Sequence, residues 1–237
     1  MNRLMRADLK RIIAKPTMYT VVIILALFIL IKEASDTAAG QMELYKELLG
    51  NLGLIFLSIP IFLSVYADEI KSGIMISMIG MGMERKNIVI TKLKDSCVLY
   101  MGSYLVLFAV AVIKNTVSGL PISPKQTAFL FLFCIFCVIR GLGIMALSSL
   151  FLFLTMSAAG GMLVLVLAAA AGSGLLKMAQ EKLKFPVYDM SFLGLLDSSF
   201  VDFQAGNFGY TIIPAFIYLA AVIVVTIIIF DRREMDL

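Results

Sequence analysis

The chain has 237 residues, of which 61% are hydrophobic and only 15% are charged. Soluble globular proteins are roughly 45–50% apolar and about 25% charged, so a soluble fold of this size would expose far too much apolar surface. We therefore expect an all-α integral membrane protein whose net charge of +4 reflects its orientation in the membrane and no binding of nucleic acid. Histidine is absent from the sequence, which excludes imidazole metal ligands and the Ser-His and Cys-His catalytic pairs.

Six apolar runs approach the length of a membrane-spanning helix, which is about 20 residues for a hydrocarbon core ~30 Å thick. They cover residues 17–31, 52–67, 97–113, 128–154, 158–176 and 210–230. We interpret them as six transmembrane helices, and the first, which is short, fits if Lys15 and Lys32 extend their side chains to the interfaces. It lacks a small-residue cleavage site, so we expect it to be retained and not removed as a signal peptide.

Lysine and arginine are distributed unequally between the two predicted sides of the membrane. Residues 1–16, 68–96 and the C-terminal end carry twelve of these bases, whereas residues 32–51, 114–127 and 177–209 carry seven over longer stretches. The side richer in bases is normally cytoplasmic. We expect both termini in the cytoplasm and the chain in the plasma membrane of a bacterial cell.

Two of the segments outside the predicted spans have a helical or partly apolar pattern. Residues 1–16 form an amphipathic sequence that ends at Pro16, which predicts a helix lying in the membrane interface; the alternative is a basic tail that only sets topology. Residues 177–209 contain many aromatic and aliphatic side chains, interrupted by proline and glycine. We expect short helices that dip into the outer interface and form an extracellular cap.

The segment 68–96 contains an apolar turn between two groups of charged residues. Residues 74–83 are rich in methionine and include Met78 and Ile79, while Gly73, Gly80 and Gly82 permit tight backbone turns. If this stretch is exposed to the cytoplasm, a partner protein should cover it. The alternative is a hairpin on the membrane surface whose basic side chains reach the lipid headgroups.

The spacing of charged residues and glycine in this segment is specific. Glu69 is followed by Gly73 four residues later, by Arg85 after another twelve and by Lys92 after another seven. This pattern resembles the permeases of the ABC-2 type transporter family, although Ile74 stands where the family often has threonine and Gly82 where it often has proline. The resemblance implies that residues 1–16 are an elbow helix and that residues 68–96 carry a coupling helix seated in an ATPase subunit. It implies coupling roles for Glu69, Gly73, Met78, Ile79, Arg85 and Lys92.

A phosphate-binding loop of the type Gly-x-x-x-x-Gly-Lys-Ser/Thr does not occur in the sequence. We therefore expect this chain not to be an enzyme and to bind no cofactor itself. The resemblance implies that ATP and Mg²⁺ bind to a separate ATPase subunit, present in two copies. It also implies a second permease subunit, either identical to this chain or different from it.

Arg140 is the only charged residue deep inside a predicted span, and the six runs contain no Asp or Glu to pair with it. An arginine at the bilayer centre costs about 2.5–3.5 kcal/mol on insertion scales, so its side chain must face protein or water. Two explanations remain open. Arg140 either caps backbone carbonyls at a helix break near Gly141 and Gly143, or it lines a translocation pathway and meets an anionic group.

These observations predict the permease subunit of an ATP-driven exporter, with an amphipathic or lipophilic cargo such as an antimicrobial or cytolytic peptide. A secondary transporter is a rival, but ion-coupled carriers usually place carboxylates inside the membrane. An intramembrane protease would need paired aspartates or histidines in the spans. A permease-like subunit that serves peptide immunity or sensing is a further alternative.

Overall fold

The computed structural model describes residues 10–12, 15–32, 38–117, 123–206 and 209–232. All regular secondary structure in these ranges is helical. The helices are α2 (Pro16–Ile31), α3 (Ala38–Lys46), η1 (Glu47–Leu52), α4 (Gly53–Phe62), η2 (Leu63–Ala67), α5 (Asp68–Lys71), α6 (Ile74–Gly80), α7 (Arg85–Val117), α8 (Pro124–Thr155), α9 (Ala158–Ala170), α10 (Gly172–Leu183), α11 (Phe192–Gln204) and α12 (Ile212–Arg232). The predicted all-α class is confirmed for the part of the chain that the structure describes.

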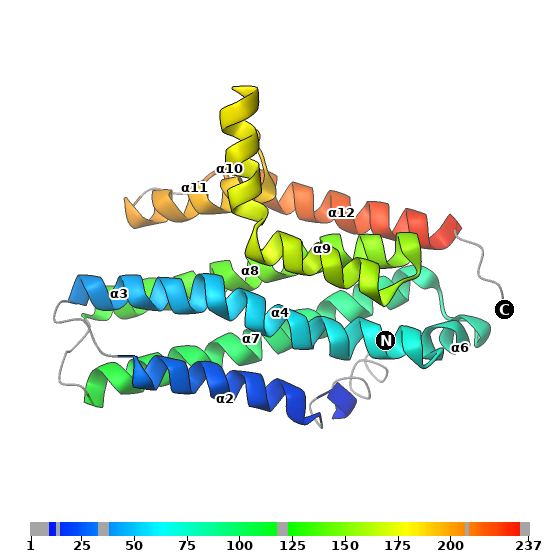
Figure 1. The fold of residues 1–237 in the computed structure, drawn as a ribbon, viewed down its shortest axis with the longest axis horizontal. Helices are drawn as coiled ribbons and strands as arrows, with labels where there is room; N and C mark the ends of the chain where they lie inside the picture. Colours follow the sequence, from blue (N-terminus) through cyan, green and yellow to red (C-terminus); the bar gives the residue numbers. More distant parts are fainter. Residues whose placement is uncertain (1–9, 13–14, 33–37, 118–122, 207–208, 233–237) are drawn as a thin grey trace.

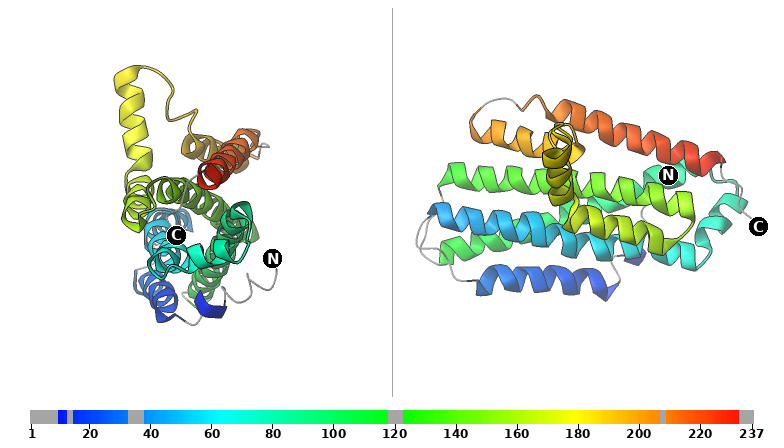
Figure 2. Two further views of the ribbon diagram at one scale, coloured as in Figure 1. Left: turned by 90° about the vertical axis from the view of Figure 1, so that its right-hand side faces the viewer. Right: turned by 45° about the horizontal axis from the view of Figure 1, so that its top comes forward.

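The long helices lie side by side in one elongated bundle (Figure 1). Helix α8 is central, because it packs against α7, α9 and α12, while α2 packs against α7 and α4. The short helix α6 lies at one end of the bundle, which we call the α6 end, and α3 lies towards the opposite end, which we call the α3 end. Helix α10 leaves the bundle at a steep angle and projects away from it (Figure 2).

Four helical segments are long and apolar enough to cross a membrane, namely Gly40–Lys71, Arg85–Val117, Pro124–Thr155 and Ile212–Arg232. A fifth candidate is the pair α9 and α10, which is bent by 69°, whereas α2 is apolar but has only 16 residues. The described residues thus contain four to five candidate spans, which is compatible with a multi-pass membrane protein. The six expected spans are not all of sufficient length.

The second and third expected spans extend further than their apolar runs. The expected outer connection 32–51 is helical from Ala38, and α3, η1, α4, η2 and α5 follow one another without interruption. Pro60 lies inside this helix and has no N–H to donate, and a π-helical segment follows it. Helix α7 begins at Arg85, twelve residues before the predicted start at residue 97.

The fifth expected span, residues 158–176, is broken. Helix α9 ends at Ala170, and Ala171 has the non-helical backbone angles φ −122° and ψ −8° before α10 begins. The residues that follow are Gly172, Ser173 and Gly174, all poor helix formers. The small residues of this run therefore lie on two helices and do not form one continuous packing face.

The expected outer segment 177–209 contains the end of α10 and the whole of α11. Its short helices are present, but α11 packs against α8 and α12 and belongs to the bundle. Phe200 of α11 contacts α8, because its ring centroid lies 5.0 Å from that of Phe129, 5.2 Å from that of Phe133 and 5.4 Å from that of Phe136. Aromatic pairs at such separations add about 0.5–1.5 kcal/mol each to simple burial.

Candidate functional site

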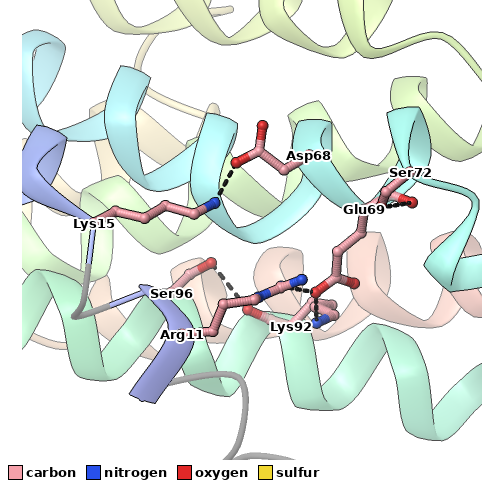
Figure 3. Close-up of polar contacts among 7 residues, drawn as sticks. All are labelled: Arg11, Lys15, Asp68, Glu69, Ser72, Lys92 and Ser96. Atoms are coloured by element: carbon pink, nitrogen blue, oxygen red, sulfur yellow. Dashed lines mark hydrogen bonds and ion pairs between the residues drawn. The ribbon is translucent and has the colours of Figure 1, made fainter.

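A buried ion-pair network lies near the α6 end of the bundle, centred on Glu69 of α5 (Figure 3). Glu69 and Lys92 are both fully buried, and the Lys92 Nζ lies 2.5 Å from the Glu69 Oε1. The Arg11 guanidinium donates to the same carboxylate oxygen. One carboxylate oxygen thus binds two bases, one from the segment before α2 and one from α7.

A second ion pair lies beside this network and is more exposed. The Lys15 ammonium donates to the carboxylate of Asp68, the residue before Glu69. Because Arg11 and Lys15 precede α2, both pairs attach the residues before α2 to α5 (Figure 3). Ile12 is fully buried and Lys10 is exposed, in agreement with the amphipathic pattern expected there, while residues 1–9 and 13–14 of the expected elbow helix lie outside the described residues.

A second buried carboxylate lies on α7. Asp95 is fully buried and lies one helical turn after Lys92, which places both side chains on the same face of α7. Burial of such a group matters energetically, because an isolated ion in a low-dielectric interior costs several kcal/mol.

Helix α6 is held between two glycine turns. Gly73 has φ +68° and Gly82 has φ +84°, both in the left-handed region that other residues avoid. The apolar stretch 74–83 was expected to be exposed, but Met75 and Met78 are buried against the chain's own core. The expected exposure of the apolar stretch holds for Met81, whose side chain is 76% exposed.

Arg85 connects the α6 end to the last helix. Its Nη1 donates to the carbonyl oxygens of Phe230 and Asp231, at 2.7 Å and 2.8 Å. Its guanidinium also lies over the Phe230 ring, 5.7 Å from the centroid. A cation at these carbonyls satisfies orphan acceptors and interacts favourably with the helix dipole, so Arg85 caps the C-terminal end of α12.

The residues singled out by their spacing thus occupy one end of the bundle. Glu69 and Lys92 form the buried pair, Gly73 makes the turn into α6, and Arg85 caps α12. Met78 belongs to the core, and Ile79 is partly buried against it. Sequence reasoning missed the pairing of Arg11 and the burial of Asp95; an acid one helical turn from Lys92 was the available signal for the latter.

Arg140 has a carboxylate partner, contrary to expectation. Its Nη1 lies 3.8 Å from Asp197 Oδ1 of α11, and the other oxygen of Asp197 accepts a hydrogen bond from the Tyr188 hydroxyl. Burial, together with this hydrogen bond, raises the pKa of Tyr188, which therefore remains a donor at neutral pH. Helix α8 continues past Gly141 and Gly143 to Thr155, so no helix break exists there for Arg140 to cap.

The six apolar runs contain no carboxylate, but the longer helices of the structure do. Glu69 lies in the candidate span Gly40–Lys71 and Asp95 in Arg85–Val117, because both helices extend beyond their apolar runs. Pairing with Lys92 and Arg11 explains how the first of these helices accommodates a buried carboxylate. A prediction from hydropathy along the sequence cannot detect ion pairs between helices.

Comparison with known proteins gives no relative, since no protein-family model, no curated protein and no solved structure matches this chain. Its function is therefore argued from the residues and their geometry.

Proposed function

We propose that this chain is the permease subunit of an ATP-driven ABC exporter of the ABC-2 type in a bacterial plasma membrane. In this proposal α2 and the bent pair α9 and α10 complete six spans, and the α6 end faces the cytoplasm. Two copies of a separate ATPase subunit bind ATP and Mg²⁺, and a second permease subunit completes the transporter. The cargo is amphipathic or lipophilic, and an antimicrobial or cytolytic peptide fits this description.

The observation that supports the proposal most is the convergence of the spacing motif on the α6 end. Glu69, Gly73, Arg85 and Lys92 were selected by residue type and spacing, through the resemblance to the ABC-2 permeases. In the folded chain Glu69 and Lys92 pair, Gly73 turns the chain into α6, and Arg85 holds α12. Motif residues that share one task are expected to lie together in this way.

The same contacts provide a route for mechanical coupling. A force on α6 acts on α5 through the Gly73 turn, and α5 is attached to α7 through Glu69 and Lys92 and to the residues before α2 through Arg11. Helix α7 begins beyond α6 and carries Arg85, which holds α12. A displacement of α6 by an ATPase would therefore reach helices on several sides of the bundle.

The outer surface of α6 is the part that a partner protein can cover. The side chain of Met81 is 76% exposed and that of Ile74 is 36% exposed, whereas Met78 is buried. An aspartate at position 81 would bury a charge in the interface only when the ATPase is bound. An aspartate at position 78 would disturb the core of the permease itself, with or without a partner.

The test is affinity purification of the tagged chain from its native membranes, followed by measurement of ATP hydrolysis. We expect a P-loop ATPase in stoichiometric amount, and we expect Met81→Asp to reduce its recovery while the yield of permease is unchanged. Met78→Asp is the comparison, because it should lower the yield of the permease. Absence of any P-loop ATPase from the wild-type preparation, with the permease intact, would refute the proposal.

A secondary transporter is the second candidate, because Glu69 and Asp95 are fully buried carboxylates within candidate spans. Buried carboxylates in membrane helices often belong to proton or ion pathways. The two functions differ in energy source. Cargo accumulation in inside-out vesicles that needs ATP and persists after an uncoupler is added supports the exporter, whereas accumulation driven by an ion gradient without ATP supports the carrier.

A further inference from the structure

An apolar groove of about 470 Å³ lies beside the central helix α8. Helices α8, α9 and α12 form its sides, and the first residues of α10 and α11 lie at one end. Its lining includes Leu147, Ala168, Leu193, Leu219 and Val222. The side-chain surface it presents is almost entirely hydrocarbon.

The groove exists because α9 is much shorter than the helix it packs against. Helix α9 has 13 residues and α8 has 32, and the break at Ala171 directs α10 away from the bundle. The N-terminal part of α8 is covered instead by α11. The Phe192 ring of α11 occupies the place that a Cβ would take at Gly143. The space between the end of α9 and the start of α11 is left unfilled.

A cation lies beyond one end of this groove. Arg140 precedes Gly143, a lining residue, by three positions on α8, and Asp197 follows Leu193, another lining residue, by four positions on α11. Residues three or four apart on a helix share one face. The pair of Arg140 and Asp197 is therefore about one helical turn from the apolar lining.

The Arg140 guanidinium has more hydrogen-bonding capacity than the structure uses. It has five N–H donors. The distance of 3.8 Å from Nη1 to Asp197 is longer than a hydrogen bond, and the buried Nε has no acceptor among the described residues. The Tyr188 hydroxyl occupies the other oxygen of Asp197. A planar anionic group could make the bidentate contact that Asp197 does not make.

The size of the groove selects among possible occupants. Its volume lies within the range of about 300–1,000 Å³ that is usual for small-molecule sites. Bulk lipid chains would fill an apolar groove without regard to headgroup charge, which is a difference that can be measured.

We propose that the groove binds an amphiphile with a single alkyl chain and an anionic head, a carboxylate or a phosphate. The alkyl chain lies between α8, α9 and α12, and the head binds to the guanidinium of Arg140 in place of Asp197. As a cargo site this inference rests on the proposed exporter function. As a binding site it does not, and its test needs neither an ATPase nor transport.

The test uses the purified full-length chain in nanodiscs of zwitterionic phosphatidylcholine, with empty nanodiscs as the reference for partition into lipid. Three probes with the same alkyl chain are titrated: dodecyl phosphate, dodecanol and dodecyltrimethylammonium. We expect saturable binding of dodecyl phosphate at one site per chain, at least about tenfold tighter than that of the other two probes. Equal binding of all three would mean that the groove holds only bulk lipid, and would overturn the proposal.

Two variants of the ion pair should act in opposite directions. Arg140→Gln should weaken binding of dodecyl phosphate by about tenfold or more, and Asp197→Asn should strengthen it, because the competing carboxylate is removed. A purely structural ion pair predicts that both variants lose binding together with thermal stability. That outcome, or an unchanged affinity in both, would overturn the proposal.

A third variant tests the alkyl chain. Ala168→Phe fills the groove and should abolish saturable binding of dodecyl phosphate, whereas Ile24→Phe adds the same ring to an exposed position on α2 and should not. Lys86→Gln removes an exposed positive charge and serves as the charge control for Arg140. Wild-type binding in a folded Ala168→Phe variant would place the ligand elsewhere and overturn the proposal.

Discussion

Glu69 illustrates how a single buried residue can determine the geometry of one end of this protein. Its carboxylate is fully buried and contacts bases that lie 58 residues before it and 23 residues after it in the sequence. Removal of the Glu69 charge would take from Lys92 the carboxylate that pairs with it in the buried interior, which is energetically costly. The arrangement favours a unique position of α5 over the sliding that apolar side chains alone would permit.

We expect the conservative substitution Glu69→Gln to destabilise the protein strongly. Glu69→Gln removes the charge but keeps the shape, which leaves Lys92 buried without this carboxylate, so the free energy of unfolding should fall by about 3–5 kcal/mol. Unfolding in mixed micelles measures this change. Glu84→Gln is the control, since Glu84 forms an exposed pair with Lys86 and should change stability by less than about 0.5 kcal/mol. Equal stability of the two variants would contradict the role assigned to Glu69.

Alanine substitutions at Gly73 and Gly80 form a matched pair that isolates the effect of the backbone angle. Gly73→Ala should destabilise the fold by about 1–2 kcal/mol, because φ +68° is unfavourable for any residue with a Cβ, although nothing lies within 4 Å of the added atom. Gly80 is equally unobstructed but lies in the helical part of α6, so Gly80→Ala should be neutral or stabilising. The difference in unfolding midpoint between the variants measures the backbone effect alone.

Helix α7 connects both ends of the bundle by capping two other helices. At its start Arg85 donates to the last carbonyls of α12, and near its end Lys114 Nζ donates to the carbonyl oxygens of Ile29, at 2.7 Å, and Lys32 at the end of α2. One long helix thus satisfies the C-terminal carbonyls of two neighbours that it also packs against.

We expect Arg85→Met to loosen the end of α12 without unfolding the bundle. Met retains much of the apolar stem, but the two hydrogen bonds to Phe230 and Asp231 are lost. Amide hydrogen exchange should accelerate in the last turns of α12 and remain unchanged in the middle of α8. Lys86→Met is the control, because Lys86 is exposed and, within the described part of the chain, forms an ion pair with the neighbouring Glu84. Unchanged exchange in α12 would contradict the capping role.

The sequence predicted the elements better than their ends. Apolar runs located every long helix, because lipid-facing and core-facing positions are both hydrophobic in such a protein. The start of α7 was predicted too late, because Lys92 and Asp95 are charged residues and only the structure shows that they are buried. The break at Ala171 was missed because its neighbours are small and apolar, which fits close packing as well as a helix end.

The site was predictable where it depended on local spacing and not where it depended on tertiary contacts. The spacing motif singled out Glu69 and Lys92, and the structure shows that the two side chains form an ion pair, which the sequence analysis did not predict. Arg11 lies far away in sequence, so its contact with Glu69 had no local signal. The partner of Arg140 was missed for the same reason, because Asp197 belongs to a segment expected to lie outside the bundle.

At the scale of the whole molecule, the two ends of the bundle are stabilised differently. The α6 end is tied by buried ion pairs, whereas towards the α3 end a neutral cluster joins α3 to α7, in which the Tyr45 hydroxyl lies 3.0 Å from Asn115 Oδ1 and 2.8 Å from Gln41 Nε2. The groove lies between them, beside the broken helix α9.

The placement of the bundle across a membrane can be tested through α7 and α8, which run in opposite directions and are joined at the α3 end. Lys86 lies at the start of α7 and Lys125 at the start of α8, so a membrane crossed by α7 must separate them. Single cysteines at these positions, in a background without Cys97, Cys134 and Cys137, report the side that each occupies. The excess of bases near the α6 end predicts that Lys125→Cys reacts with an impermeant thiol reagent in intact cells and that Lys86→Cys reacts only after permeabilisation. The reverse pattern would invert the proposed orientation and exclude an ATPase docked on α6 from the cytoplasm, and reaction of both in intact cells would contradict α7 as a span.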